Sequence, residues 1–163
     1  ERVEIAGQIK RGKTVAVLFG GVAPYAIVIA KNSKAKKILS VEIGKVCCEY
    51  ARKNVKLNKL NNVEIIQGDV KKTVTRLKEK FDYIIAARPQ LKDSFLKETL
   101  MLCKRRSLVF YYAFGKQEII ETVKRDIETE AGKYRKKVKF LKIKKAGEIA
   151  PYKYRWRIDF KII

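Results

Sequence analysis

The feature that most constrains the fold is an alternation of apolar, β-branched runs with segments of helical spacing along most of the chain. The expected strands are 14–19, 37–42, 63–67, 81–86 and 107–113. The expected helices are 24–30, 45–58, 70–79, 94–103 and 116–131. Continuous apolar strands that alternate with helices indicate a parallel sheet covered by helices on both faces.

The segment 45–58 has the clearest helical pattern. Its side chains Val46, Tyr50, Val55 and Leu57 fall near one stripe, and Lys and Arg lie on the other side. A stripe of this kind predicts the face of the helix that packs on the sheet.

Two final runs, 137–144 and 154–163, alternate strictly between apolar and polar residues and have no helix between them. Two strands joined without a crossover pair antiparallel. The Rossmann-like class I methyltransferase fold ends in such a hairpin, whereas nicotinamide-binding domains end all-parallel. We therefore predict an α/β fold of this methyltransferase type: a mostly parallel seven-stranded sheet with a final antiparallel hairpin and helices on both faces.

The charge of the chain indicates a polyanionic partner. It has 39 Lys and Arg against 17 Asp and Glu, a net charge of +22, and nucleic acid is the commonest partner of such a surface. The alternative is a Lys-rich solvated surface without a binding role. The basic residues concentrate in the segments 31–37, 71–80, 103–106 and 133–145.

Composition also excludes several kinds of site. The chain has no His, which excludes His-based catalysis and His metal ligands. Its three cysteines form no CxxC motif, so we predict no metal site and expect Cys47 and Cys103 to be small buried side chains. No apolar run approaches the length of a membrane span. We expect a cytoplasmic monomer.

Aromatic residues in the last run allow two interpretations. They could stack on bases between phosphate-binding cations, or they could face the core of a final strand whose Lys and Arg point outward. Strict alternation favours the second interpretation. The residues concerned are Tyr152, Lys153, Tyr154, Arg155, Trp156 and Arg157. We also expect Tyr111, Tyr112 and Phe114 to be core residues.

Polar residues and glycines gather where the expected strands end, which is the ligand-binding edge of a doubly wound sheet. Glu42 ends the second strand about twenty residues after the turn 19–24, where a carboxylate can accept the hydroxyls of a ribose. Asp69 follows the third strand and can accept from an adenine amine. Each acid could instead cap the helix that begins after it.

The turn 19–24 reads FGGVAP. It lacks the third glycine of GxGxxG and the lysine of GxxxxGK[ST], so it fits neither a nicotinamide fingerprint nor a phosphate loop. The combined spacing of this turn, Glu42 and Asp69 suits a cofactor that has adenosine but no pyrophosphate. S-adenosyl-L-methionine (AdoMet) is the common example.

Four blocks of the chain carry a resemblance to a known family. They are LFGGVAPY, VEIGKVCCEYARKNVKLNKLNNVEIIQGDV, FDYIIAARPQLKDSFL and VFYYAFGKQE. With them the chain resembles the catalytic domain of the archaeal and eukaryotic tRNA guanine-N1 methyltransferases that modify position 37, beside the anticodon. Relatives in the wybutosine pathway share this fold, and the resemblance covers essentially all of residues 1–163.

The resemblance implies a role for individual residues. Glu1 matches the general base that takes the proton from guanine N1, and Arg2 or Arg88 could stabilise charge on guanine O6. Pro89 matches the proline of the family's Asn-x-Pro turn, which helps to hold the target guanine. The implied AdoMet contacts are Phe19, Gly20, Gly21, Val22, Ala23 and Pro24 for the methionine part, Glu42 with Ile43 for the ribose, and Asp69 with Val70 for the adenine.

The activity implied is methyl transfer from AdoMet to N1 of guanosine 37, with the anticodon-loop region of tRNA as partner. Two alternatives stay open. Val17, Ala23 and Ala87 depart from residues common in the family, which would suit a non-catalytic RNA-binding relative. A wybutosine-type transferase of an aminocarboxypropyl group would use the same scaffold. Whole enzymes of the family carry an N-terminal RNA-binding domain, which we expect to be missing from the methyltransferase domain 1–163.

Overall fold

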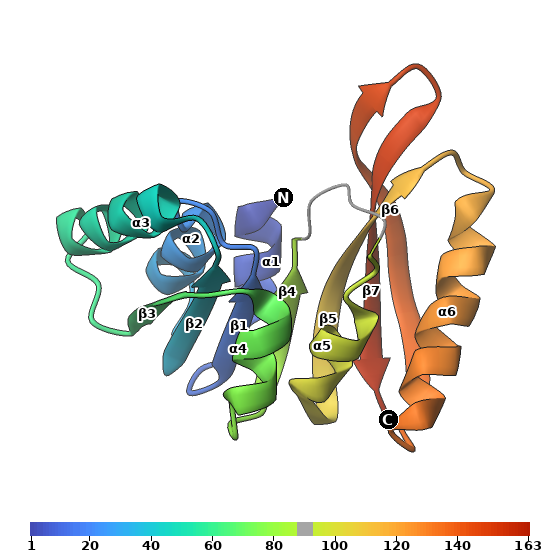
Figure 1. The fold of residues 1–163 in the computed structure, drawn as a ribbon, viewed down its shortest axis with the longest axis horizontal. Coiled ribbons are helices and arrows are strands. Elements are labelled where there is room, and N and C mark those ends of the chain that lie inside the picture. The colour runs from blue at the N-terminus through green and yellow to red at the C-terminus, as the bar shows by residue number, and fades with distance from the viewer. Residues whose placement is uncertain (88–92) are drawn as a thin grey trace.

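In the computed structural model of this chain, residues 1–87 and 93–163 are described. Seven strands form one sheet in the order β3-β2-β1-β4-β5-β7-β6 (Figure 1). The strands are β1 (Thr14–Leu18), β2 (Lys37–Glu42), β3 (Val63–Gln67), β4 (Phe81–Ala86), β5 (Cys103–Gly115), β6 (Val138–Ala150) and β7 (Lys153–Ile162).

The strand directions confirm the predicted fold class. β1 pairs parallel with β2 and β4, β2 with β3, and β4 with β5. β7 lies between β5 and β6 and pairs antiparallel with both. The parallel strands β1 to β4 therefore end at one edge of the sheet, called here the carboxyl edge, and begin at the opposite, amino edge.

Helices cover both faces of the sheet, each with its own core. On one face lie α1, α2 and α3, which bury Ile5, Ala26 and Ala51 against the sheet; on the other lie α4, α5 and α6, which bury Val74, Leu100 and Ile127. Within the described residues, no helix is long and apolar enough to cross a membrane. The helices are α1 (Arg2–Gln8), α2 (Pro24–Asn32), α3 (Lys45–Leu57), α4 (Val70–Arg76), α5 (Leu96–Met101) and α6 (Ile119–Lys133).

The buried face of α3 differs from the prediction. Val46, Tyr50 and Leu57 are exposed by 62%, 54% and 78%, whereas Cys48 and Ala51 are fully buried. Small side chains let the helix backbone approach the sheet closely, so the larger apolar residues lie outside that contact. The prediction that Cys47 is buried was wrong, because its neighbour Cys48 occupies the buried face of α3, while Cys103 is buried as expected.

Arg157 on β7 also departs from the prediction that basic residues of the last strand point outward. Its side chain is fully buried. Because α1 covers this face of β7, a position that alternation assigns to solvent lies inside the protein. Helix α1 itself had not been predicted. Tyr111 and Tyr112 are buried as expected, Trp156 is 5% exposed and Tyr152 is 75% exposed.

Candidate functional site

The turn after β1 is tightly folded. Phe19, Gly21 and Ala23 all adopt left-handed backbone conformations, with φ of 60°, 55° and 68°. At Gly20 an added Cβ would lie 2.0 Å from the Ser40 Oγ on the neighbouring strand β2. Gly20 therefore serves close packing. Ala23 holds, at the start of α2, a conformation that glycine would adopt with less strain.

Glu42, at the end of β2, ties two loops of the carboxyl edge together. Its Oε2 accepts a hydrogen bond from the Gly21 backbone N–H at 2.9 Å, and its Oε1 accepts from the Gly44 N–H at 2.8 Å. Gly44 is the N-cap residue of α3. The carboxylate thus organises the glycine turn and the start of α3, and its predicted contact with a ribose stays a prediction.

A mostly apolar cavity of about 270 Å³ lies beside this turn. Four of the predicted cofactor residues line it, together with Lys71, Asp93 and Phe95; the four are Phe19, Ile43, Asp69 and Val70. The rings of Phe19 and Phe95 meet edge to face at 4.7 Å. Aromatic and aliphatic walls with a few polar groups are typical of small-molecule sites.

Asp69 caps a helix, which is one of the two roles that the sequence allowed for it. Its Oδ1 accepts a hydrogen bond of 2.7 Å from the Lys71 backbone N–H, so it caps the short helix α4. It also lines the apolar cavity. Capping and contact with a ligand are compatible here, because a carboxylate has two oxygens.

The other predicted cofactor residues lie in the turn but do not line the apolar cavity. Ala23 is fully buried under α2, Val22 is 42% exposed, and Pro24 is the first residue of α2. The Val22 carbonyl accepts a hydrogen bond of 3.1 Å from the Asn54 side chain on α3. The structure therefore brings the glycine turn and the apolar cavity to one edge of the sheet.

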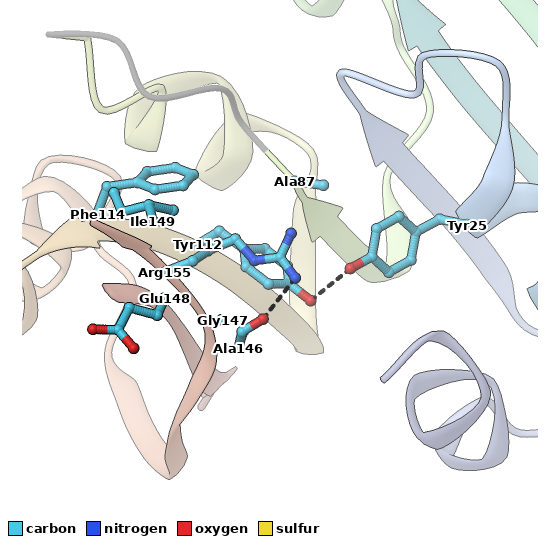
Figure 2. A pocket seen from close by; sticks show the side chains of 9 residues that line it. All are labelled: Tyr25, Ala87, Tyr112, Phe114, Ala146, Gly147, Glu148, Ile149 and Arg155. Atoms are coloured by element: carbon cyan, nitrogen blue, oxygen red, sulfur yellow. Dashed lines mark hydrogen bonds between the residues drawn. The ribbon is translucent and has the colours of Figure 1, made fainter. Parts of the chain in front are cut away.

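A second cavity, of about 280 Å³, opens on the other side of β4, and Figure 2 shows its walls. Side chains from α2, β5, β6 and β7 surround it. Ala87, directly after β4, lines it. The residues that line this cavity are Tyr25, Ala87, Tyr112, Phe114, Ala146, Gly147, Glu148, Ile149 and Arg155.

Glu1, the predicted general base, contacts three residues that line this second cavity. Its Oε1 accepts a hydrogen bond from the Tyr112 hydroxyl and lies 3.4 Å from the Tyr25 hydroxyl. Its Oε2 lies 3.1 Å from the Arg155 Nη2. The two tyrosine hydroxyls lie 2.8 Å apart. Glu1 itself does not line the cavity, and these contacts hold its carboxylate against residues that do.

Both tyrosines are protonated at neutral pH, and burial raises the pKa of Tyr112 and of Tyr25 further above the ordinary value for a phenol. Each phenol has one proton to donate. When Tyr112 donates to Glu1, the short contact between the hydroxyls requires Tyr25 to donate to Tyr112. The hydrogen bonds then run in one direction, from Tyr25 to Tyr112 and from Tyr112 to the Glu1 carboxylate.

The other predicted catalytic residues are not shown to line the second cavity. The Arg2 guanidinium lies over the ring of Tyr25, 5.5 Å from its centre, and does not line the cavity. Arg88 and Pro89 fall within residues 88–92, outside the described residues. Their roles stay predictions.

Arg155 is a site residue that sequence reasoning assigned to the surface. Its Nη2 donates to the Ala146 carbonyl at 2.8 Å as well as to Glu1, and its guanidinium lies 5.4 Å from the centre of the Tyr112 ring. Its Nε is buried and has no hydrogen-bond partner among the described residues. The available signal was the alternation of β7, which places Arg155 on the same face as Arg157.

A buried ion cluster holds α1, and with it Glu1, against the sheet. Arg157 Nε and Nη2 donate to Asp159 at 2.8 and 2.9 Å, and Nη2 and Nη1 donate to Glu4 at 3.0 and 3.2 Å. Lys142 and Lys144 also reach Glu4. The hydrogen bonds from Arg157, Lys144 and Lys142 hold the pKa of Glu4 well below its ordinary range. Glu1 lies almost one helical turn before Glu4, so this cluster sets its position.

Comparison with known proteins identifies the family. The model of the TRM5/TYW2 methyltransferase domain matches residues 1–141. The chain belongs to this family. It is 30% identical to the tRNA (guanine(37)-N(1))-methyltransferase Trm5b of Pyrococcus abyssi over 99% of the chain and 48% of that protein. The crystal structure of that Trm5b superposes with a TM-score of 0.88 over 99% of the chain and 47% of its own.

Two other solved structures of the family carry informative ligands. TYW2 of M. jannaschii in complex with AdoMet is 26% identical, with a TM-score of 0.89 over 99% of this chain and 73% of its own. The complex of aTrm5 with tRNALeu is also 26% identical, with a TM-score of 0.83 over 99% of this chain and 45% of its own. The chain spans about half the length of the curated relatives that it matches.

Proposed function

We propose that residues 1–163 are the AdoMet-dependent methyltransferase domain of a tRNA-modifying enzyme, and that it methylates N1 of guanosine 37 beside the anticodon. The observation that supports this proposal is the Glu1 carboxylate, which contacts Tyr112, Tyr25 and Arg155, three residues that line the second cavity. The proposal includes a cytoplasmic monomer whose partner is the anticodon-loop region of tRNA.

The residues beside the glycine turn fit AdoMet. Phe19, Ile43, Val70 and Phe95 supply apolar walls for a flat adenine ring, and Glu42 lies between the two loops that would enclose the ribose. AdoMet supplies a methyl group on a positively charged sulfur, which makes that carbon an electrophile. The chain has to orient the acceptor nitrogen toward it and remove a proton.

Glu1 is the residue that we propose for that proton transfer. Guanine N1–H is a weak acid, so the nitrogen needs a base nearby as it attacks. With AdoMet bound, the N1–C bond would form as the S–C bond broke, and the Glu1 carboxylate would take the N1 proton. The hydrogen bonds from Tyr112 and Arg155 prevent the carboxylate from rotating away from the cavity. Alignment of this kind accounts for much of the rate in transfers without covalent enzyme intermediates.

Arg155 is better placed than Arg2 to support the guanine. It lines the second cavity, whereas Arg2 lies against the ring of Tyr25. Negative charge develops on guanine O6 as N1 loses its proton, and a cation near O6 stabilises it. Arg155 also has a buried Nε without a partner among the described residues, so the guanidinium has hydrogen-bonding capacity left.

The test has three arms on one preparation of the chain. Isothermal titration measures AdoMet binding for the wild type and for Glu42→Ala. A methyl-transfer assay then compares tRNA transcripts with guanosine or adenosine at position 37, for the wild type and for Glu1→Gln. Mass spectrometry of the digested tRNA identifies the modified nucleoside.

The proposal requires 1-methylguanosine from the first transcript alone, and a loss of activity with retained AdoMet binding in Glu1→Gln. Binding of tRNA without binding of AdoMet would instead establish the non-catalytic relative, for which the strained backbone of Ala23 and the methyl group of Ala87 are the supporting features. An aminocarboxypropyl product on a wybutosine precursor would establish the third interpretation.

A further inference from the structure

A hollow at the amino edge of the sheet is lined mainly by cations. Its volume is about 730 Å³, against about 280 and 270 Å³ for the two cavities at the carboxyl edge. The two cavities at the carboxyl edge each have one basic residue in their walls. Six of the eleven residues that line the amino-edge hollow are basic: Lys10, Lys13, Lys104, Arg105, Arg106 and Lys161.

The strand register explains why these cations converge. Tyr83 on β4 is paired with Leu108 on β5, and Leu108 is paired with Lys161 on β7. Lys10 and Lys13 lie between α1 and the start of β1, and the Lys10 backbone N–H donates to the Tyr83 hydroxyl at 3.2 Å. Lys10 and Lys161, 151 positions apart in the chain, thus meet at one edge of the sheet.

A bulge in β5 turns three of the cations out together. Phe81 is paired with Cys103 and Tyr83 with Leu108, so residues 104–107 have no regular partners on β4. Buried Ser107 holds the bulge: its Oγ donates to the Phe81 carbonyl at 2.6 Å and accepts from the Lys104 backbone N–H at 2.8 Å. In a regular strand these side chains would alternate between the two faces, and a bulge re-aims them.

One acid in the hollow neutralises only part of this charge. Asp82 accepts hydrogen bonds from Thr14 and forms ion pairs with Lys13 at 3.3 Å and with Lys104 at 3.0 Å. Burial acts to raise the pKa of Asp82, but the hydrogen bonds and nearby cations outweigh it and the pKa is lowered. Among the described residues, no salt bridge engages the other four cations, Lys10, Arg105, Arg106 and Lys161.

We propose that this hollow is a second RNA contact, which binds backbone phosphates of the tRNA at the edge of the sheet opposite to the methyl-transfer site. Lys and Arg side chains that bind phosphates position an RNA without reading its sequence. β1 has five residues, so the two edges lie roughly 17 Å apart. A folded tRNA is long enough to reach both. The inference rests on the proposed function, because tRNA is the polyanion that it names.

The test compares two triple variants that each remove three positive charges. The first is Lys10→Gln/Arg105→Gln/Arg106→Gln, which keeps the ion pairs of Asp82 and keeps a Cβ at the left-handed Arg106. The second, a matched control, is Arg52→Gln/Lys53→Gln/Lys56→Gln, on the exposed face of α3. Filter binding measures the affinity for a tRNA transcript over a series of salt concentrations, and far-ultraviolet circular dichroism checks folding.

We expect the hollow variant to bind tRNA on the order of tenfold more weakly near physiological salt, with a salt slope smaller by about 2 to 3. The control should change much less. Equal weakening in both variants, or no weakening in the first, would overturn the proposal. Binding of tripolyphosphate to the wild type and to the hollow variant is measured as well. If the hollow variant loses tripolyphosphate binding but keeps its tRNA affinity, the hollow is a small-anion site and the proposal is overturned.

AdoMet titration and methyl transfer separate this inference from the proposed function. If the chain binds tRNA through the hollow but neither binds AdoMet nor methylates, the second RNA contact stands and the proposed activity fails. If methylation proceeds and the hollow variant binds tRNA like the wild type, the proposed activity stands and the second RNA contact fails.

Discussion

The Arg155 Nη2 donates to the Glu1 Oε2 across 3.1 Å, joining the last strand to the residue before the first helix. The two residues are 154 positions apart in the chain. The same Nη2 also donates to the Ala146 carbonyl, so β6 restrains the guanidinium as well. Through this bond the final hairpin sets the orientation of the predicted general base.

Removal of this restraint should slow methyl transfer without weakening AdoMet binding. For Arg155→Met we expect kcat to fall by about 10- to 100-fold, because misplacement of a catalytic group by 1 Å can cost about 100-fold. The KM for AdoMet should stay within about twofold, since Arg155 lies away from the apolar cavity. Steady-state kinetics on a tRNA transcript measure both values.

Arg155→Lys is the control, because its ammonium group keeps the positive charge but has no planar fork to reach both Glu1 and Ala146. We expect it to recover part of the lost rate. A change in the KM for AdoMet with kcat intact would contradict the positioning role of Arg155.

Glu42→Gln should weaken AdoMet binding by tenfold or more. An amide has one acceptor oxygen in place of two, so either the Gly21 or the Gly44 N–H loses its partner and one of the two loops shifts. Isothermal titration measures the affinity. Glu49→Gln on α3 makes the same change outside this pair of loops, and its affinity should match the wild type. Wild-type affinity in Glu42→Gln would refute the role of the carboxylate.

Arg157→Met should destabilise the fold strongly, because it leaves Asp159, which is only 2% exposed, without its partner. Loss of one member of a buried ion pair typically costs about 3 to 5 kcal/mol. The double variant Arg157→Met/Asp159→Leu has no orphaned charge, so we expect it to regain most of that stability. Urea unfolding measures both variants, and a double variant no more stable than the single one would be the contrary result.

The ion pairs of Glu4 with Arg157, Lys142 and Lys144 should stabilise the fold above about pH 4.3, the ordinary pKa of a Glu side chain. This contribution should be lost as the pH falls further. The folded pKa is lowered, so protons bind more readily to the unfolded chain and acid favours unfolding. Urea unfolding of the wild type and Glu4→Gln at pH 7, 5 and 3 tests this. We expect the wild type to be the more stable at pH 7, with a gap that narrows toward pH 3; a constant gap would rule out the pairing as its cause.

Local patterns in the sequence predicted the parallel sheet well, because β1, β2 and β4 are apolar runs that are largely buried on both faces. The predicted bounds 37–42, 63–67 and 81–86 agree with β2, β3 and β4. The carboxyl-edge positions of Phe19, Glu42 and Asp69 followed from the same topology. The sequence missed α1, because seven residues with few buried side chains carry too little periodicity to show a helix.

The amino-acid sequence by itself determined the α/β class, the bounds of β2, β3 and β4 and the residues that gather at the carboxyl edge, since these depend on short-range periodicity. Only the tertiary structure decided that Arg155 restrains Glu1, that Arg157 is buried under α1, and that the bulge in β5 faces Lys10. Such contacts depend on strand register and on which face a helix covers. Those choices are set by packing between distant segments, which no local pattern encodes.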